Sequence, residues 1–165
     1  MDEARDSPGV IAPPPLIALT ALLFGLALDW FFPSFILRGV FGFATRVIIG
    51  AILIAVGAAM AILARSKFLQ AGTNVEPWKP SLKLVTGGIF AWMRNPMYVG
   101  LMLLFAGISI ALGSDWMLVL LVLMAVILHF GVVKREERYL EAKFGENYHA
   151  YLDRVPRYGL PTARH

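Results

Sequence analysis

Three candidates for chemistry in this sequence, two groups of polar residues and one histidine, lie beside or within long apolar stretches. The first is Arg94, Asn95 and Pro96, followed by Tyr98 and Gly100, at the start of an uncharged run. Asn and Pro are favoured where a helix begins, and the free N–H groups there attract anions. Arg94 adds a bidentate charged donor and Tyr98 adds a hydroxyl, so the group predicts a binding site for a carboxylate or phosphate. The alternative is that Arg94 only reaches toward lipid headgroups.

The second group is the pair Glu136 and Glu137, which follows the last long apolar run. A carboxylate at the exit from a membrane needs a cationic partner, and the amino group of a ligand would serve as one. The alternative is a solvated helix face on which Lys134, Arg135 and Arg138 neutralise the pair.

The third candidate is His129, which lies inside the last apolar run. An ionisable residue at such depth indicates function, although a neutral His bonded to a neighbouring helix is the alternative. His129 precedes Glu136 by two helical turns, so the two are expected on one face. The spacing to the other histidines fits no metal site, and the absence of cysteine excludes a disulfide framework and a thiolate site. We expect no metal.

The composition predicts that these groups are held by membrane helices. Hydrophobic residues make up 58% of the 165 residues and charged residues 16%, against about 45–50% and about 25% in soluble domains. Four apolar runs approach the roughly 17–25 residues that a helix needs to cross a bilayer: 16–32, 47–64, 96–114 and 116–133. Because the runs do not alternate, helices are expected instead of a barrel. The chain is predicted to be one all-α integral membrane domain, 1–165, with four transmembrane helices.

The charges predict the orientation. Thirteen of the 15 Lys and Arg residues fall before the first run, in a connector over 65–95, or after 133. Both termini are therefore expected in the cytoplasm. Residues 1–15 are expected as a flexible tail and 134–158 as an amphipathic cap broken at Gly145. Asp115 is the expected N-cap of the fourth helix. Basic residues spread along a membrane rim predict membrane lipids as partners and no nucleic acid; the oligomeric state stays open.

Two motifs occur in a fixed order: LVTGGIFAWMRNPMYVG, and then H-x6-EE-x2-L-x3-FG-x2-Y-x2-Y-x3-VPR. Together, over about 68–158, they resemble the isoprenylcysteine carboxyl methyltransferase family, a relative of the phospholipid N-methyltransferases. Asn95 stands where eukaryotic members usually have histidine, a variant common among prokaryotic relatives, so the resemblance implies a membrane of the prokaryotic inner-membrane type. The resemblance implies an enzyme that binds S-adenosylmethionine from the cytoplasm, at Gly88, Tyr98, His129, Glu136 and Glu137.

The same resemblance implies the catalytic residues. Arg94, with Asn95 as a positioning partner, would face a lipophilic acceptor that enters from the bilayer, and Glu137 would act beside them. A carboxylate acceptor, with a reference pKa near ~4, is already anionic and needs only Arg94 to hold it. An ammonium acceptor must first lose a proton to a base such as Glu137 or His129.

Prenylcysteine-like carboxyl O-methylation is therefore the expected prototype of the activity. The alternatives are N- or S-methylation of a phospholipid or another small molecule, an NADPH-dependent membrane reductase with a similar Arg-x-Pro-x-Tyr element, and a non-enzymatic tetraspan transporter. The glutamate pair and the tyrosines after it favour the sulfonium cofactor.

Overall fold

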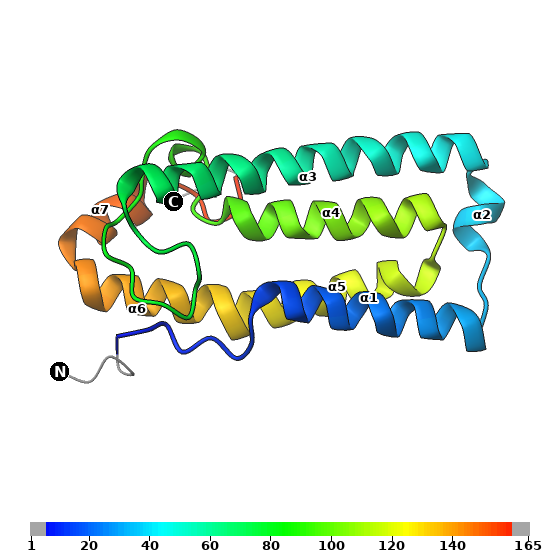
Figure 1. Ribbon diagram of the computed structural model, residues 1–165, viewed down its shortest axis with the longest axis horizontal. Helices are drawn as coiled ribbons and strands as arrows, with labels where there is room; N and C mark the ends of the chain where they lie inside the picture. The colour runs from blue at the N-terminus through cyan, green and yellow to red at the C-terminus, as the bar shows by residue number, and fades with distance from the viewer. Residues whose placement is uncertain (1–5, 160–165) are drawn as a thin grey trace.

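The computed structural model describes residues 6–159, in which every regular element is helical (Figure 1). The elements are α1 (Pro14–Phe31), α2 (Ile36–Val40), α3 (Phe43–Ala71), the 3-10 helix η2 (Gly88–Ala91), α4 (Pro96–Leu112), α5 (Asp115–Leu128), the π-helix η3 (His129–Val133), α6 (Lys134–Phe144) and α7 (Glu146–Arg154). The predicted all-helical fold is confirmed.

Three helical segments are long and apolar enough to cross a membrane: Pro14–Phe31, Phe43–Ala71 and the continuous Asp115–Phe144. The fourth apolar helix, α4, has 17 residues and is shorter. α3 is much longer than the predicted run over 47–64, because the polar residues that follow it still favour a helix. It ends where Gly72 adopts a left-handed conformation with φ of 67°. The first turns of the predicted connector are therefore helical.

The turn before α5 corrects one prediction. Ser114, not Asp115, is the N-cap, and its hydroxyl accepts a hydrogen bond from the N–H of Met117 at 3.1 Å. The Asp115 carboxylate instead accepts from the N–H groups of Ile36 and Leu37, at 2.8 and 2.9 Å. It therefore caps α2, a short helix that the sequence did not predict. Ser and Asp are equally good caps, so only the distant partner decides between them.

α3 and α4 lie side by side along a stripe of glycines (Figure 1). A Cβ added to Gly57 would lie 2.5 Å from the carbonyl oxygen of Gly100, and one added to Gly50 would lie 2.6 Å from that of Gly107. Small residues let membrane helices approach at backbone distance. The pairing is antiparallel, so the residues that precede α4 are held against the end of α3.

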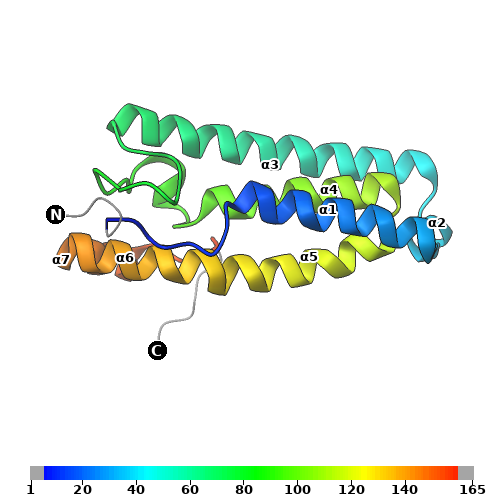
Figure 2. The same cartoon turned by 60° about the horizontal axis from the view of Figure 1, so that its bottom comes forward.

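α1 and α5 form a second antiparallel pair, seen from another side in Figure 2. Gly25 of α1 packs against Met117 of α5, and the Trp116 indole N–H donates to the carbonyl oxygen of Phe32 at 2.7 Å. The buried core between the pairs consists of Phe105, Met117, Met124, Leu128 and Val132.

The polar elements gather at one end of the helices, opposite α2 (Figure 1). α6 and α7 are separated at Gly145, as predicted, where φ is 49°. The segment before α1, expected to be flexible, lies along α6 from Asp6 onward. The Asp6 carboxylate accepts from the Tyr139 hydroxyl and from Lys143, both at 2.7 Å, and the lysine lowers its pKa. Arg135 donates to the carbonyl oxygen of Gly9 at 2.7 Å.

The glycine stripe makes a prediction about stability. We expect Gly57→Leu to lower the free energy of unfolding by about 1–3 kcal/mol, because the new side chain separates α3 from α4. The matched control is Gly39→Leu, where a Cβ meets nothing within 4 Å. Unfolding titrations in detergent measure both variants. Equal stability of the two would contradict the close helix contact.

Candidate active site

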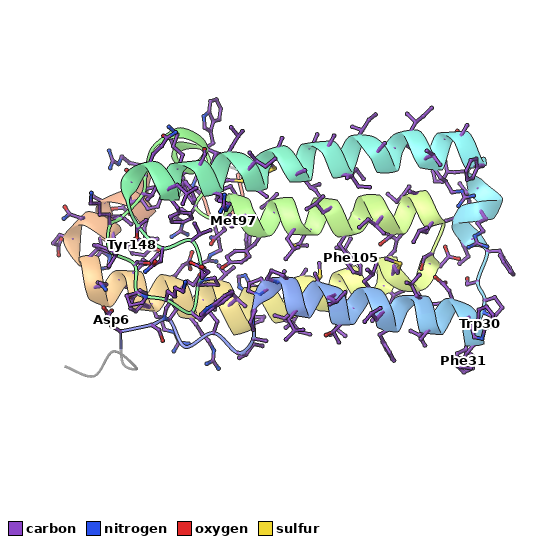
Figure 3. The ribbon with its side chains drawn as sticks, viewed as in Figure 1. Asp6, Trp30, Phe31, Met97, Phe105 and Tyr148 are labelled. Carbon is purple, nitrogen blue, oxygen red and sulfur yellow. The ribbon has the colours of Figure 1, made fainter. Side chains whose placement is uncertain are left out.

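A cavity opens at the polar end of the molecule, between α6, α7, the start of α4 and the segment after α3. We call it the site cavity. Figure 3 shows Tyr148 and Met97, which both line it, at this end, while Trp30 and Phe31 lie at the other. Its polar side chains include Arg94, Asn95, Tyr98, Glu136 and Glu137, and its aromatic ones Phe68, Phe90, Tyr139, Tyr148 and Tyr151. Two predicted groups, one before and in α4 and one in α6, therefore meet in one cavity.

Glu136 is a partly buried carboxylate without a countercharge. The Tyr98 hydroxyl donates to its Oε1 at 2.8 Å. None of the ion pairs among residues 6–159 involves Glu136. A carboxylate removed from water and left unpaired is costly. A cation bound in the site cavity would offset that cost.

Glu137, by contrast, is joined to two arginines. Arg157 donates to it bidentately, from Nε to Oε1 at 2.9 Å and from Nη2 to Oε2 at 2.6 Å. Nη2 of Arg94 lies 3.3 Å from Oε1. These bonds raise the pKa of Arg157. The side chains of Glu137 and Arg94 are only 13% and 10% exposed, so the group is charge-assisted and largely shielded from water. Lys134, Arg135 and Arg138 do not pair with Glu137 in the described part of the chain.

The segment after α7 is bonded to the residues before α4. The N–H of Arg94 donates to the carbonyl oxygen of Pro156 at 3.0 Å, and that of Asn95 to the carbonyl oxygen of Arg157 at 3.2 Å. The Asn95 side chain also donates to Arg157, at 3.4 Å, and makes no capping bond to α4. Asn95 is buried. It therefore positions the backbone that carries Arg157.

Aromatic side chains form the rest of the wall. Tyr148 and Tyr151 are buried, and the Tyr151 hydroxyl donates to the carbonyl oxygen of Phe90 at 2.6 Å. Burial raises the pKa of both tyrosines, so they stay neutral at physiological pH. The rings of Phe68 and Phe90 meet edge to face at 5.0 Å. Aromatic rings and a carboxylate together suit a cationic ligand with a flat ring system.

Two residues expected at the cofactor do not line the site cavity. Nδ1 of His129 lies 2.7 Å from the hydroxyl of Tyr158. His129 begins η3, and a π-helical turn holds more residues than an α-helical one, so Glu136 is rotated away from the face of His129. Gly88 has φ of 64° and packs against the Lys67 side chain.

Arg157, Tyr148 and Tyr151 were not predicted as site residues. The two tyrosines, three positions apart, and Arg157 entered the sequence analysis only as part of the second motif. The regular spacing of Tyr148 and Tyr151 on α7 is the one signal that indicates a shared wall. Nothing in the local sequence pairs Arg157 with a glutamate 20 residues earlier.

The fold and the site define an integral-membrane helical protein with a ligand cavity at one end. The model of the phospholipid methyltransferase family matches residues 45–147, from α3 into α7. The chain therefore belongs to this family of membrane methyltransferases that use S-adenosylmethionine, and the resemblance drawn from the motifs is confirmed.

Two curated relatives are similar over most of the chain. Protein-S-isoprenylcysteine O-methyltransferase of Schizosaccharomyces pombe is 30% identical over 135 residues, 79% of this chain and 55% of that protein. The Xenopus laevis protein of the same name is 33% identical over 119 residues, 69% of this chain and 40% of its own length. The chain thus spans about half the length of the curated relatives it matches. No solved structure matches.

The contrast between the two glutamates makes a prediction. Glu137→Gln leaves two arginines without a countercharge, so we expect it to lower the free energy of unfolding by about 1.5–3 kcal/mol. Glu136→Gln removes a carboxyl group that has no cationic partner and keeps an acceptor for Tyr98, so we expect no loss of stability. Unfolding titrations in detergent, without ligand, compare the two. If Glu136→Gln were the more damaging, the division of roles would be wrong.

Proposed function

We propose that this chain transfers a methyl group from S-adenosylmethionine to a lipophilic acceptor at the cytoplasmic face of the membrane. The observation that carries the proposal is the partly buried Glu136 carboxylate, which faces the site cavity without a cation. The cofactor has an ammonium group, a sulfonium and an adenine ring, and the carboxylate and the aromatic wall fit all three. When bound, it supplies an electrophilic methyl group on sulfur.

The residues of the chain act by binding and positioning. Glu136, held by Tyr98, binds the amino group of the cofactor, and Tyr148 and Tyr151 exclude water from the wall. Glu137 orients Arg94, which faces the acceptor. Since the leaving thioether needs no protonation, alignment supplies much of the acceleration, and well-oriented reactions gain about 7–11 kcal/mol in this way.

Among acceptors, we propose a prenylcysteine-like carboxylate, the group that the names of the two relatives indicate. It is ionised at neutral pH and requires no base. The family description also favours a phospholipid amine, which must first lose a proton. The two bases expected for that step are occupied, because Glu137 is bound by two guanidinium groups and His129 contacts Tyr158 outside the site cavity. This arrangement supports the carboxylate over the amine.

We further propose that α1, α3, α4 and α5 all cross the membrane, and that α6 and α7 form a cytoplasmic cap. Two antiparallel pairs return the chain to its starting side, and α3 lies beside α4 along the whole of the shorter helix, α4 (Figure 1). The unequal distribution of Lys and Arg supports a cytoplasmic position for both termini and for the site cavity.

Cofactor binding tests the role of Glu136. We expect Glu136→Gln to weaken S-adenosylmethionine binding about tenfold or more, because a charge-assisted hydrogen bond is lost. Glu146→Gln, an exposed glutamate on α7 outside the site cavity, is the matched control. Calorimetric titration of purified protein in detergent measures both, with NADPH as the competing ligand. Binding of NADPH instead of S-adenosylmethionine would contradict the proposed function.

Turnover tests the role of Arg94. We expect Arg94→Lys to reduce turnover by about 10²-fold, because the planar fork that orients the acceptor is lost. Affinity for the cofactor should change little. Membrane lipids and prenyl-thiol analogues are incubated with methyl-deuterated cofactor, and mass spectrometry identifies the labelled product. A collapse of cofactor binding would place Arg94 in the cofactor site instead.

A further inference from the structure

The residues before α1 form part of the wall of the site cavity. Residues 6–13, which we call the strap, have no regular structure and lie along α6 and η3. Pro8 of the strap lines the site cavity, together with Tyr139 of α6 and Ser81 of the loop over 72–87. The strap, α6 and that loop therefore meet at one edge of the cavity.

The site cavity is closed in this conformation. Its volume is about 90 Å³, whereas pockets that hold a drug-sized ligand measure about 300–1,000 Å³. The cofactor of the proposed function, a nucleoside joined to an amino acid, belongs to that larger class of ligands. It can enter only if part of the wall moves.

A small polar junction holds the outer end of the strap. The Tyr139 hydroxyl donates to the Asp6 carboxylate at 2.7 Å, and it accepts from Lys143 at 2.9 Å and from the N–H of Ser81 at 3.0 Å. Lys143 also pairs with Asp6 at 2.7 Å. Because the Asp6 side chain is 49% exposed, water and salt compete with this pair. The junction can therefore open at low cost.

The inner end of the strap is fixed, and a glycine lies between the two ends. The N–H of Ile11 donates to the carbonyl oxygen of Gly131 at 3.2 Å, and Val10 packs against the buried core. Gly9 has φ of 60°, although a Cβ there would meet nothing within 4 Å. Glycine is thus favoured at this position by the backbone and not by space. Apart from the bond that Arg135 donates to its carbonyl oxygen at 2.7 Å, Gly9 is suited to be a hinge.

The loop over 72–87 is held more firmly than the strap. Thr73 is only 7% exposed, and its hydroxyl accepts from the N–H groups of Leu82 and Lys83, at 2.8 and 3.3 Å. Asn74 donates to the carbonyl oxygen of Pro80 at 2.9 Å. Of residues 6–13, by contrast, none is buried. Segments with few buried contacts open at the lowest cost, so the strap is the part of the wall that moves.

We infer that the strap is a gate, which swings about Gly9 away from the site cavity to admit the cofactor from water and then closes over it. Asp6 is the latch, on Tyr139 and Lys143. The identity of the ligand rests on the proposed function, whereas the movement of the strap does not. Since the cofactor enters and leaves through the same gate, the latch controls how fast S-adenosylmethionine exchanges and not how tightly it binds.

Exchange rates of the cofactor test the latch. We expect Asp6→Asn/Arg135→Gln to raise the association and dissociation rate constants of S-adenosylmethionine together, by about threefold or more, as the loss of exposed charged contacts allows. The dissociation constant should stay within about twofold. Rapid filtration with radiolabelled cofactor measures both rates on the full-length protein in detergent. Slower association with weaker affinity would indicate damage to the site and would overturn the gate.

Two further variants sharpen the rate measurement. Gly9→Ala strains the latched conformation without removing a contact, because a left-handed φ is unfavourable for alanine, so both rate constants should rise about fivefold or more. Glu141→Gln is the matched control, since it removes another exposed ion pair of α6, with His149, outside the site cavity. It should leave both rates unchanged. Unchanged rates in Gly9→Ala and in the double variant would contradict the gate.

Thiol labelling follows the gate without the cofactor. The chain has no cysteine, so Met97→Cys places a single thiol in the site cavity. We expect a cationic methanethiosulfonate, which reaches this thiol through water, to label it about threefold faster when the strap carries Asp6→Asn and α6 carries Arg135→Gln. Gln70→Cys, exposed on α3 outside the cavity, is the control and should be labelled equally in both backgrounds.

The two readouts separate the possible failures. Equal labelling of Met97→Cys in both backgrounds overturns the gate, whatever the protein binds. Faster labelling, with no binding of S-adenosylmethionine by the unmodified protein, supports the gate and overturns the proposed function alone.

Discussion

The ion pairs of Glu137 hold together parts of the chain that are far apart in sequence. Arg94 precedes α4, Glu137 lies on α6, and Arg157 follows α7. Charges this shielded from water are stable only when all of them are paired, because the cost of removing one partner exceeds the value of its contact. The three side chains therefore behave as one unit. Their pairing determines where α6 and α7 lie relative to the membrane helices, and thus the shape of the site cavity.

The environment of Glu136 depends on this ion-paired group of Arg94, Glu137 and Arg157. The two glutamates are adjacent on α6, and one residue of an α-helix turns the side chain by about 100°. Glu137 consequently faces the arginines, while Glu136 faces the site cavity and Tyr98. One carboxylate is neutralised within the protein and its neighbour is not. A stable arrangement thus leaves one carboxyl group without a countercharge for a ligand, beside a guanidinium group with two donors that have no partner.

A feature could be predicted from the sequence when the residues that determine it are close together along the chain. The apolar helices are predictable because length and composition within one segment determine them, and the break at Gly145 is equally local. Asp115 was assigned wrongly because its partners, the N–H groups of Ile36 and Leu37, come from another element. The expected alignment of His129 with Glu136 assumes uniform α-helical rotation, which η3 interrupts. Arg157 was missed for the same reason as the contact of Asp115. An ion pair between residues far apart in sequence is not visible in local spacing.

The position of α6 explains how one small helical protein can bring together two reactants of opposite solubility. In the proposed function the cofactor comes from water and the acceptor from lipid, so neither should have to cross the compartment of the other. The site cavity satisfies this requirement, because it lies at the polar end of the molecule, next to the first residues of the apolar helix α4. The reactants must still meet in one space, because the methyl group passes directly from the sulfur to the acceptor atom. Arg94 and Glu137 line the site cavity, so the ion-paired unit and the proposed acceptor contact occur at the same residues.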